Sequence, residues 1–252
     1  MNDPQPLAEI VDEARRLTDA AADQELPIRL VGGLAIKLRA DGSLHPALTR
    51  AYKDIDLVTP KGRGKPVGAF LTTMGYAPDE PFNAFNGGTR LLFYDLAHER
   101  QLDVFVGIFR MCHEIPLTDR VTLDPVTLPL AELLLTKLQI VSLNEKDLRD
   151  TIAILLHHPI ADDDGPAINA RRVAELCADD WGLWRTSKMN VTRVREGLDS
   201  YELSDRERAT VNQRLDELWE RIDAAPKSRG WRLRDRIGDR KRWYEEPDEV
   251  EA

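Results

Sequence analysis

The stretch PIRLVGGLAIKLRA (residues 27–40) combines three local signals that decide how the fold begins. An apolar run over 27–31 has the length and composition of a buried strand. It leads directly into Gly32 and Gly33, and the segment after them has a helical pattern. Glycine tolerates tight backbone turns and close approach by other groups. The stretch therefore predicts a strand, a glycine turn and a helix.

The next strand is predicted over DIDLVT (54–59). Side chains alternate between the two faces of a strand, so Asp54 and Asp56 share one face while Ile55 and Leu57 point to the opposite, apolar side. Two adjacent carboxylates repel, and burial makes their charge more costly. A divalent cation would remove that repulsion, and Mg²⁺ commonly takes one or two carboxylates together with substrate phosphates.

The rest of the chain separates into a sheet-forming part and a helical part. A helix is predicted over 5–23 and another over 66–76. Two adjacent strands are predicted within 83–96 and 100–109, joined around His98–Arg100. From about residue 129 onward we expect helices only, with a linker at 161–167. The prediction is an α+β fold: a small mixed β-sheet core flanked by helices (1–127), followed by a C-terminal helical region (128–252).

A third acidic residue, Asp103, lies among apolar residues in QLDVFVG (101–107). If its strand lies beside the strand of Asp54 and Asp56, three carboxylates from two neighbouring strands meet. That is the set a two-metal site needs to activate an attacking oxygen and stabilise a leaving one. The turn at Gly32 and Gly33 opens a helix, where backbone N–H groups favour the negative charge of phosphates.

A Gly-Gly turn, an Asp-x-Asp strand and a third strand aspartate, in that order, resemble the DNA polymerase β-like nucleotidyltransferase superfamily. The resemblance covers about residues 26–125. It extends to LAELLLTKLQI (130–140) and EKDLRDTIAIL (145–155), which look like helices of the AbiEii-type branch, a group that includes toxins of toxin–antitoxin systems. The chain differs from the common Gly-Ser form of the motif, because Gly33 stands at the second position.

The resemblance implies a Mg²⁺-dependent nucleotidyltransferase that moves a nucleotide from an NTP to an acceptor hydroxyl. Asp54 and Asp56 would hold the metal, Asp103 would act as general base or third metal ligand, and Gly32 and Gly33 would contact the phosphates. The acceptor is expected to be RNA, in particular a tRNA end, with a cognate antitoxin as partner. A protein hydroxyl or a small molecule of the aminoglycoside type is an alternative acceptor, and a non-catalytic nucleotide-binding or partner-binding module is an alternative function.

Several basic residues are candidates for binding the nucleotide. Lys137 lies in the apolar helix LLLTKLQI, where a lysine needs an anion or a path to water. That anion is a nucleotide phosphate, or alternatively Asp147 or Asp150. Arg50 or Lys53, in the connection 41–53, is expected near the phosphates. The candidate nucleotide-binding residues are Gly32, Gly33, Lys37, Lys53, Lys137 and Asp147, and Lys137 is also a candidate catalytic residue.

Composition predicts a cytoplasmic protein without a membrane segment, because no apolar run approaches the ~18 residues needed to span a bilayer and the N-terminus lacks a signal-peptide pattern. The net charge is −9. Residues 227–243 are nevertheless basic, with eight Lys or Arg, two Asp and the tryptophans Trp231 and Trp243. Such a segment either binds phosphates and stacks on bases, or forms an amphipathic helix whose tryptophans pack on the protein body.

Overall fold

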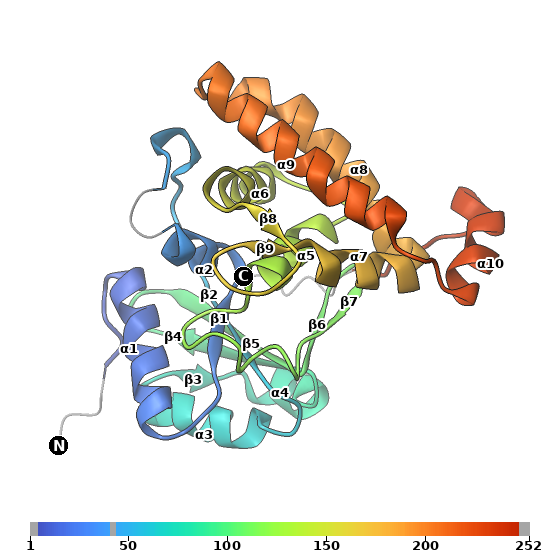
Figure 1. The fold of residues 1–252 in the computed structure, drawn as a ribbon. Coiled ribbons are helices and arrows are strands. Elements are labelled where there is room, and N and C mark those ends of the chain that lie inside the picture. Colours follow the sequence, from blue (N-terminus) through green and yellow to red (C-terminus); the bar gives the residue numbers. More distant parts are fainter. Residues whose placement is uncertain (1–4, 41–43, 247–252) are drawn as a thin grey trace.

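The computed structural model describes residues 5–40 and 44–246 and shows an α+β fold (Figure 1). A five-stranded mixed sheet has the strand order β1-β2-β5-β4-β3. Its strands are β1 (Arg29–Val31), β2 (Ile55–Thr59), β3 (Ala77–Pro78), β4 (Arg90–Asp95) and β5 (Arg100–Val106). Helix α1 (Ile10–Asp23) precedes β1, and the helices between the strands are α2 (Gly32–Arg39), α3 (Gly64–Thr73) and α4 (Glu80–Asn86), with a short 3₁₀ turn η1 (Pro46–Leu48).

The later part of the chain is mainly helical and packs on the sheet region. Its elements are β6 (Ile108–Arg110), β7 (Glu114–Pro116), α5 (Leu130–Leu138), α6 (Glu145–His157), β8 (Ile160–Ala161), β9 (Ile168–Asn169), α7 (Ala170–Asp179), α8 (Trp181–Gly197), η2 (Leu198–Ser200), α9 (Asp205–Ala224), α10 (Arg229–Ile237) and η3 (Gly238–Arg240). Figure 1 shows α6–α9 on one side of the sheet and α3 on the other. Buried apolar side chains of the two regions form one continuous cluster.

The centre of the sheet is a parallel pair of strands, β2 and β5, flanked by antiparallel neighbours. Ile55 and Leu57 of β2 and Leu102 and Val104 of β5 are fully buried on one face. Since successive side chains alternate, the residues between them point to the other face. The aspartates of β2 and β5 therefore lie on the face opposite these four apolar side chains.

Two segments differ from the sequence prediction in the sheet region. Residues 80–86, whose second half falls in the predicted strand 83–96, form helix α4, because Asp79 caps its N-terminus and Pro81 suits the first helical turn. The predicted strand 100–109 ends at Val106, because Gly107 has φ +76° and turns the chain into the separate β6–β7 hairpin.

The helical region also contains a small sheet that the sequence prediction missed. The strands β8 and β9 are two residues long each and pair in parallel. They flank the predicted linker 161–167, which forms the loop between them. Such short strands carry too few residues to show an alternating pattern in the sequence.

All five tryptophans of the chain form one cluster in the helical region. Trp231 of α10 is 9% exposed and packs on Trp184, while Trp243 packs on Trp181. The two tryptophans of the basic segment 227–243 therefore pack on the protein body, in agreement with the structural alternative. Within the described part of the chain, every helix is too short or too polar to cross a membrane.

Candidate functional site

Asp56 and Asp103 lie side by side on the sheet face opposite Ile55, Leu57, Leu102 and Val104. The parallel pairing of β2 and β5 places their Cα atoms directly opposite each other. Asp103 is buried, with 4% of its surface exposed, and Asp56 is partly buried. Asp54 directly precedes β2 and is exposed. The structure therefore brings Asp56 and Asp103 together, with Asp54 at the edge of the pair.

The carboxyl group of Asp56 has an unusual protonation behaviour. Burial, together with the charges of Asp103 and Asp54, raises its pKa from 3.8 to about 7, although the charges of Lys137 and Arg90 oppose the rise. Burial disfavours the charged form of the carboxyl, and the neighbouring carboxylates add to this effect. Such perturbed groups are concentrated at functional sites.

Gly32 packs directly against Asp56. Its backbone has φ +72°, which other residues rarely adopt, and a Cβ placed on it would lie 2.2 Å from Oδ2 of Asp56. Both the backbone conformation and the close approach therefore require glycine. The glycine turn predicted from the sequence is therefore in contact with Asp56, one of the predicted metal ligands.

Gly33 packs against a second group of charged side chains. A Cβ on Gly33 would lie 1.8 Å from Nη2 of Arg50. The Arg50 guanidinium forms two hydrogen bonds with Asp150, Nε to Oδ1 at 2.9 Å and Nη2 to Oδ2 at 2.8 Å. Such a two-point pair fixes both side chains. Burial alone would raise the pKa of Asp150, but Lys137 and Arg50 hold it below its usual value.

Lys137 of α5 joins this group from the other side. Its Nζ lies 2.9 Å from Oδ1 of Asp147 and 2.9 Å from Oδ2 of Asp150, both on α6. Burial lowers the pKa of Lys137, but the two carboxylates more than offset this, and the pKa stays above its usual value. Of the anions considered for Lys137, the two aspartates both contact it in the structure. Lys137, Asp147, Asp150 and Arg50 form the charged cluster described below.

The remaining predicted lysines are placed differently. Lys37 of α2 lies with its Nζ 5.2 Å from the centre of the Tyr52 ring, and Arg50 stacks on the same ring at 4.3 Å. Lys53 is exposed next to Asp54. Lys146, on the same helix as Asp147 and Asp150, is exposed. Lys37 thus borders the charged cluster, and Tyr52 is a neighbour that the sequence did not indicate.

Arg90 and Gln101 are further site residues that the sequence analysis missed. Nε of Arg90 donates to Oδ1 of Asp103 at 2.7 Å, and Nε2 of Gln101 donates to Oδ2 at 2.8 Å. Gln101 is two residues before Asp103 on the same strand, so strand alternation could have placed it on the same face. Arg90 comes from β4, and only the pairing of β4 with β5 brings it there.

The residues of this face suit a hard divalent cation in their chemistry. Oxygen donors are the ligands of Mg²⁺, and a bound cation would offset both the burial of the Asp56 charge and its repulsion by Asp103 and Asp54. Both carboxylate oxygens of Asp103 already accept a hydrogen bond, one from Arg90 and one from Gln101. Over residues 5–40 and 44–246, no three His, Cys, Asp or Glu side chains are already arranged to hold a metal ion. The fit therefore rests on Asp54 and Asp56, and the role of Asp103 stays a prediction.

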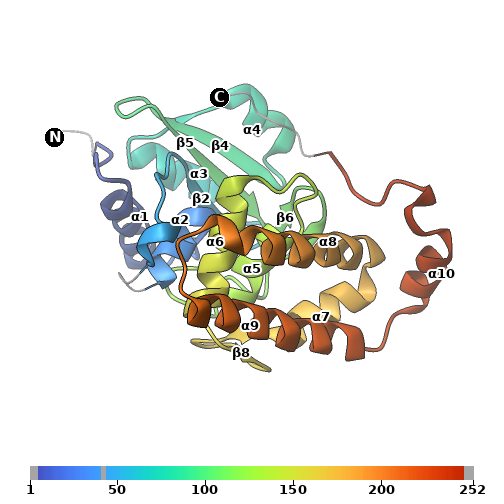
Figure 2. The same ribbon diagram turned by 90° about the horizontal axis from the view of Figure 1, so that it is seen from above.

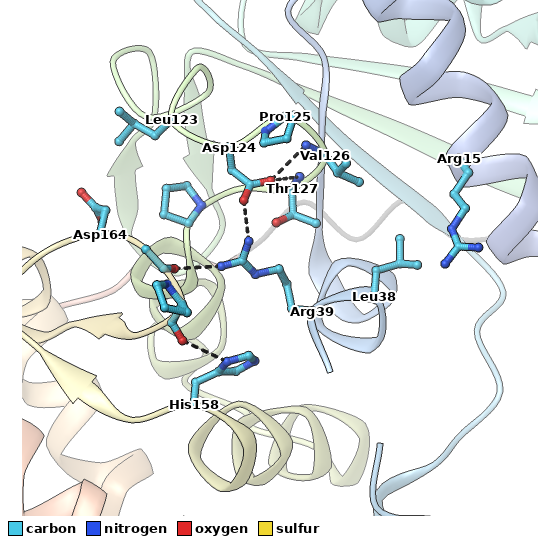
Figure 3. Close-up of a pocket in the computed structure, with 13 residues that line it drawn as sticks. Arg15, Leu38, Arg39, Leu123, Asp124, Pro125, Val126, Thr127, His158 and Asp164 are labelled. Carbon is cyan, nitrogen blue, oxygen red and sulfur yellow. Dashed lines mark hydrogen bonds and ion pairs between the residues drawn. The ribbon is translucent and has the colours of Figure 1, made fainter. Parts of the chain in front are cut away.

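A separate cavity of about 720 Å³ lies at the far end of α2 (Figure 3). Arg39 in its wall is bound to Asp124 and to the carbonyl of Gly165, and His158 contacts the carbonyl of Pro166. Burial lowers the pKa of His158 to about 4, so its ring is neutral at pH 7. None of the predicted site residues lines this cavity.

Replacing Gly32 by alanine is expected to destabilise the fold by about 2–3 kcal/mol and to displace Asp56. Left-handed backbone costs a residue with a Cβ about 1–2 kcal/mol. The contact with Asp56 adds to this. Gly62 is a matched control, because it has φ +83° and a Cβ placed on it would have nothing within 4 Å. Urea unfolding of Gly32→Ala and Gly62→Ala measures the difference, and equal losses would show that the contact with Asp56 is unimportant.

Comparison with models of protein families and with curated proteins finds no match to this chain.

Proposed function

We propose that the chain is a Mg²⁺-dependent nucleotidyltransferase. The observation that supports this most is the pairing of Asp56 with Asp103 on adjacent parallel strands, with Gly32 pressed against Asp56. Carboxylates placed together beside a glycine turn at a helix N-terminus combine a cation site with a phosphate site. That combination matches the chemistry of an NTP with its metal ion.

The three carboxylates would have two roles, which are to bind the metal ion and to accept the proton of the acceptor hydroxyl. Asp54 and Asp56 would hold the ion, which when bound neutralises charge on the carboxylates and the phosphates. The acceptor oxygen forms a bond to the α-phosphorus while the bond from that phosphorus to the bridging oxygen breaks. The hydroxyl proton passes to Asp103, and pyrophosphate leaves. Arg90 and Gln101 orient the Asp103 carboxylate, each through a hydrogen bond to a different oxygen.

The phosphates would lie at the other end of the site, along Gly32 and Gly33. Backbone N–H groups at the start of α2 favour anions. The charged cluster behind Gly33 contains two cations and two carboxylates, so its net charge is zero. Its main effect is to fix Arg50 and Lys137 in place. Lys37 adds positive charge at its border.

A non-catalytic nucleotide-binding module is the second candidate. The observation in its favour is the ion pair between Arg90 and Asp103, which occupies the carboxylate that a catalyst would need. In that case the protein would bind NTP without transferring any part of it.

Transfer of label from α-³²P-labelled NTPs, in the presence of Mg²⁺ and total RNA, distinguishes the two functions. We expect the parent chain to label an acceptor and Asp54→Asn to label none. Asp19→Asn, which removes an exposed carboxylate on α1, should label as the parent does. A small-molecule fraction of the lysate, used in place of RNA, tests the aminoglycoside-type acceptor. Binding of labelled NTP by the parent without transfer to any acceptor would favour the binding module.

A further inference from the structure

A small cavity lies beside Asp103 on the same face of the sheet. It has a volume of about 130 Å³, and Phe105, Arg90 and Phe82 line it together with Asn86, Thr89, Arg110, Met111, Glu245 and Glu246. Phe105 follows Asp103 by two residues on β5 and therefore shares its face. Arg90 is the cross-strand partner of Phe105 and binds Asp103. The cavity is thus a direct continuation of the carboxylate site.

The direction of the proposed reaction places the acceptor in this cavity. In phosphoryl and nucleotidyl transfer, the attacking and leaving oxygens lie roughly in line on opposite sides of phosphorus. The leaving pyrophosphate belongs at Gly32, Gly33 and the charged cluster. The strand order places β1, which leads into Gly32, on one side of β2, and β5 and β4 on the other. The acceptor therefore approaches from the side of Asp103 and Arg90.

The lining of the cavity suits the end of a single-stranded polynucleotide. The Arg90 guanidinium lies 5.6 Å from the ring centre of Phe82 and 5.5 Å from that of Phe105. Phe85, three residues after Phe82 on α4, is 91% exposed. Residues three apart are neighbours on a helix surface. Aromatic rings next to arginines stack bases and attract phosphates without selecting a sequence.

Residues 241–246, here called the C-terminal strap, contribute Glu245 and Glu246 to the wall of this cavity. Figure 2 shows the chain running back from α10 toward α4. Nε1 of Trp243 donates to Oγ1 of Thr186 at 3.1 Å, and the backbone N–H of Glu245 donates to the carbonyl of Cys112 at 3.0 Å. These contacts place Glu245 and Glu246 in the cavity wall, where their carboxylates have the charge of a polynucleotide phosphate.

We propose that the cavity beside Asp103 receives the 3′ end of a single-stranded RNA acceptor, and that the C-terminal strap is a cover that this RNA displaces. The inference rests on the proposed function for its direction of attack. The strap is held by one tryptophan and a few hydrogen bonds, so it is a separable element. A cavity of about 130 Å³ is below the ~300–1,000 Å³ of typical ligand sites, so a nucleotide enters only after the strap moves.

The substitution Gly182→Ala is expected to displace the C-terminal strap without changing any charge. A Cβ on Gly182 would lie 2.5 Å from the backbone oxygen of Trp243, so the strap must shift. Faster tryptic cleavage after Arg242 reports its release. The affinity for a short fluorescent RNA with a free 3′ hydroxyl, measured by anisotropy at fixed salt without NTP, is expected to rise about fivefold or more. A chain that ends at Arg242 should show the same increase.

Two further variants separate this effect from general electrostatics. Glu245→Gln with Glu246→Gln should raise RNA affinity, whereas Asp19→Asn with Asp23→Asn, on exposed positions of α1, should leave it nearly unchanged. Phe85→Ala in the Gly182→Ala background should lower affinity about fivefold, because a stacked base contributes about 1–3 kcal/mol. Phe85 is exposed, so the fold is unaffected.

Unchanged RNA affinity in the chain that ends at Arg242 would overturn the proposal. So would a Gly182→Ala variant with a released strap and parental affinity, because the gain in the other variants would then reflect charge alone. These binding measurements need no turnover. Nucleotidyl transfer by a protein whose strap has no effect would refute the cover and leave the proposed function intact. Tighter RNA binding by the strap variants without any nucleotidyl transfer would support the cover and refute the proposed function.

Discussion

Asp56→Asn is expected to abolish nucleotidyl transfer and also to make the metal-free protein more stable at pH 8. Loss of one group that stabilises charge in a transition state typically lowers the rate by about 10²–10³, and Asp56 also holds the metal in the proposed site. The stability gain follows from the raised pKa of this carboxyl, about 7 in the folded chain. In the unfolded chain the group ionises near about pH 4.

The sign of the pH dependence follows from these two values. Below about pH 4 the Asp56 carboxyl is protonated in both states and does not oppose folding. As the pH rises to about 7, the unfolded chain is ionised first, and folding becomes less favourable. Above that pH the folded state must accommodate the charge. Each pKa unit corresponds to about 1.36 kcal/mol, so the free-energy cost of the raised pKa is at most about 4 kcal/mol. Because Asp56 is partly exposed, solvent screening reduces this free-energy cost to about 2 kcal/mol.

Urea unfolding at pH 5 and pH 8 in the presence of a chelator measures this effect. Asp56→Asn should be about 2 kcal/mol more stable than the parent at pH 8 and much closer to it at pH 5. Asp54→Asn is the control, because Asp54 is exposed and its loss should stop transfer with a smaller gain in stability. An asparagine variant that is less stable than the parent at pH 8 would mean that the Asp56 charge is already compensated in the folded protein.

Lys137→Met is expected to destabilise the fold by about 3–5 kcal/mol. The lysine Nζ contacts Asp147 and Asp150, and all three residues are buried. Removing one partner of a buried ion pair leaves a charge without compensation, which is the source of this cost. Arg50 still binds Asp150 in the variant, so the loss falls mainly on Asp147.

Thermal or urea unfolding measures this change, and Lys146→Met on the neighbouring helix provides the comparison. Lys146 is exposed, so its loss should change the free energy of unfolding by less than about 0.5 kcal/mol. Lys137→Arg should keep much of the stability, because the charge remains. If Lys137 also acts on a phosphate, this arginine variant will fold but transfer more slowly. Equal stability of Lys137→Met and the parent would contradict the structural role of the ion pair.

Local sequence patterns were sufficient for the central part of the fold. The apolar run before Gly32, the glycine turn and the helical spacing after it determined β1 and α2, because each depends only on residues near in sequence. Strand alternation correctly placed Asp56 opposite Ile55 and Leu57. The same local logic failed at 83–86, where the cap at Asp79 and the proline after it lie outside the window that looked like a strand.

The tertiary structure alone decided which of these groups meet. The register of β2 against β5 puts Asp56 beside Asp103, and the pairing of β4 with β5 brings Arg90 to the same place. Lys137 had several acceptable anions in the sequence, and the packing of α5 on α6 selected Asp147 and Asp150. The sequence by itself determined the elements and the faces that their polar residues occupy, since these follow from short-range backbone geometry. The packing of elements far apart in the sequence decided which side chains contact one another, because the two residues of an ion pair or a ring contact have no fixed spacing along the chain.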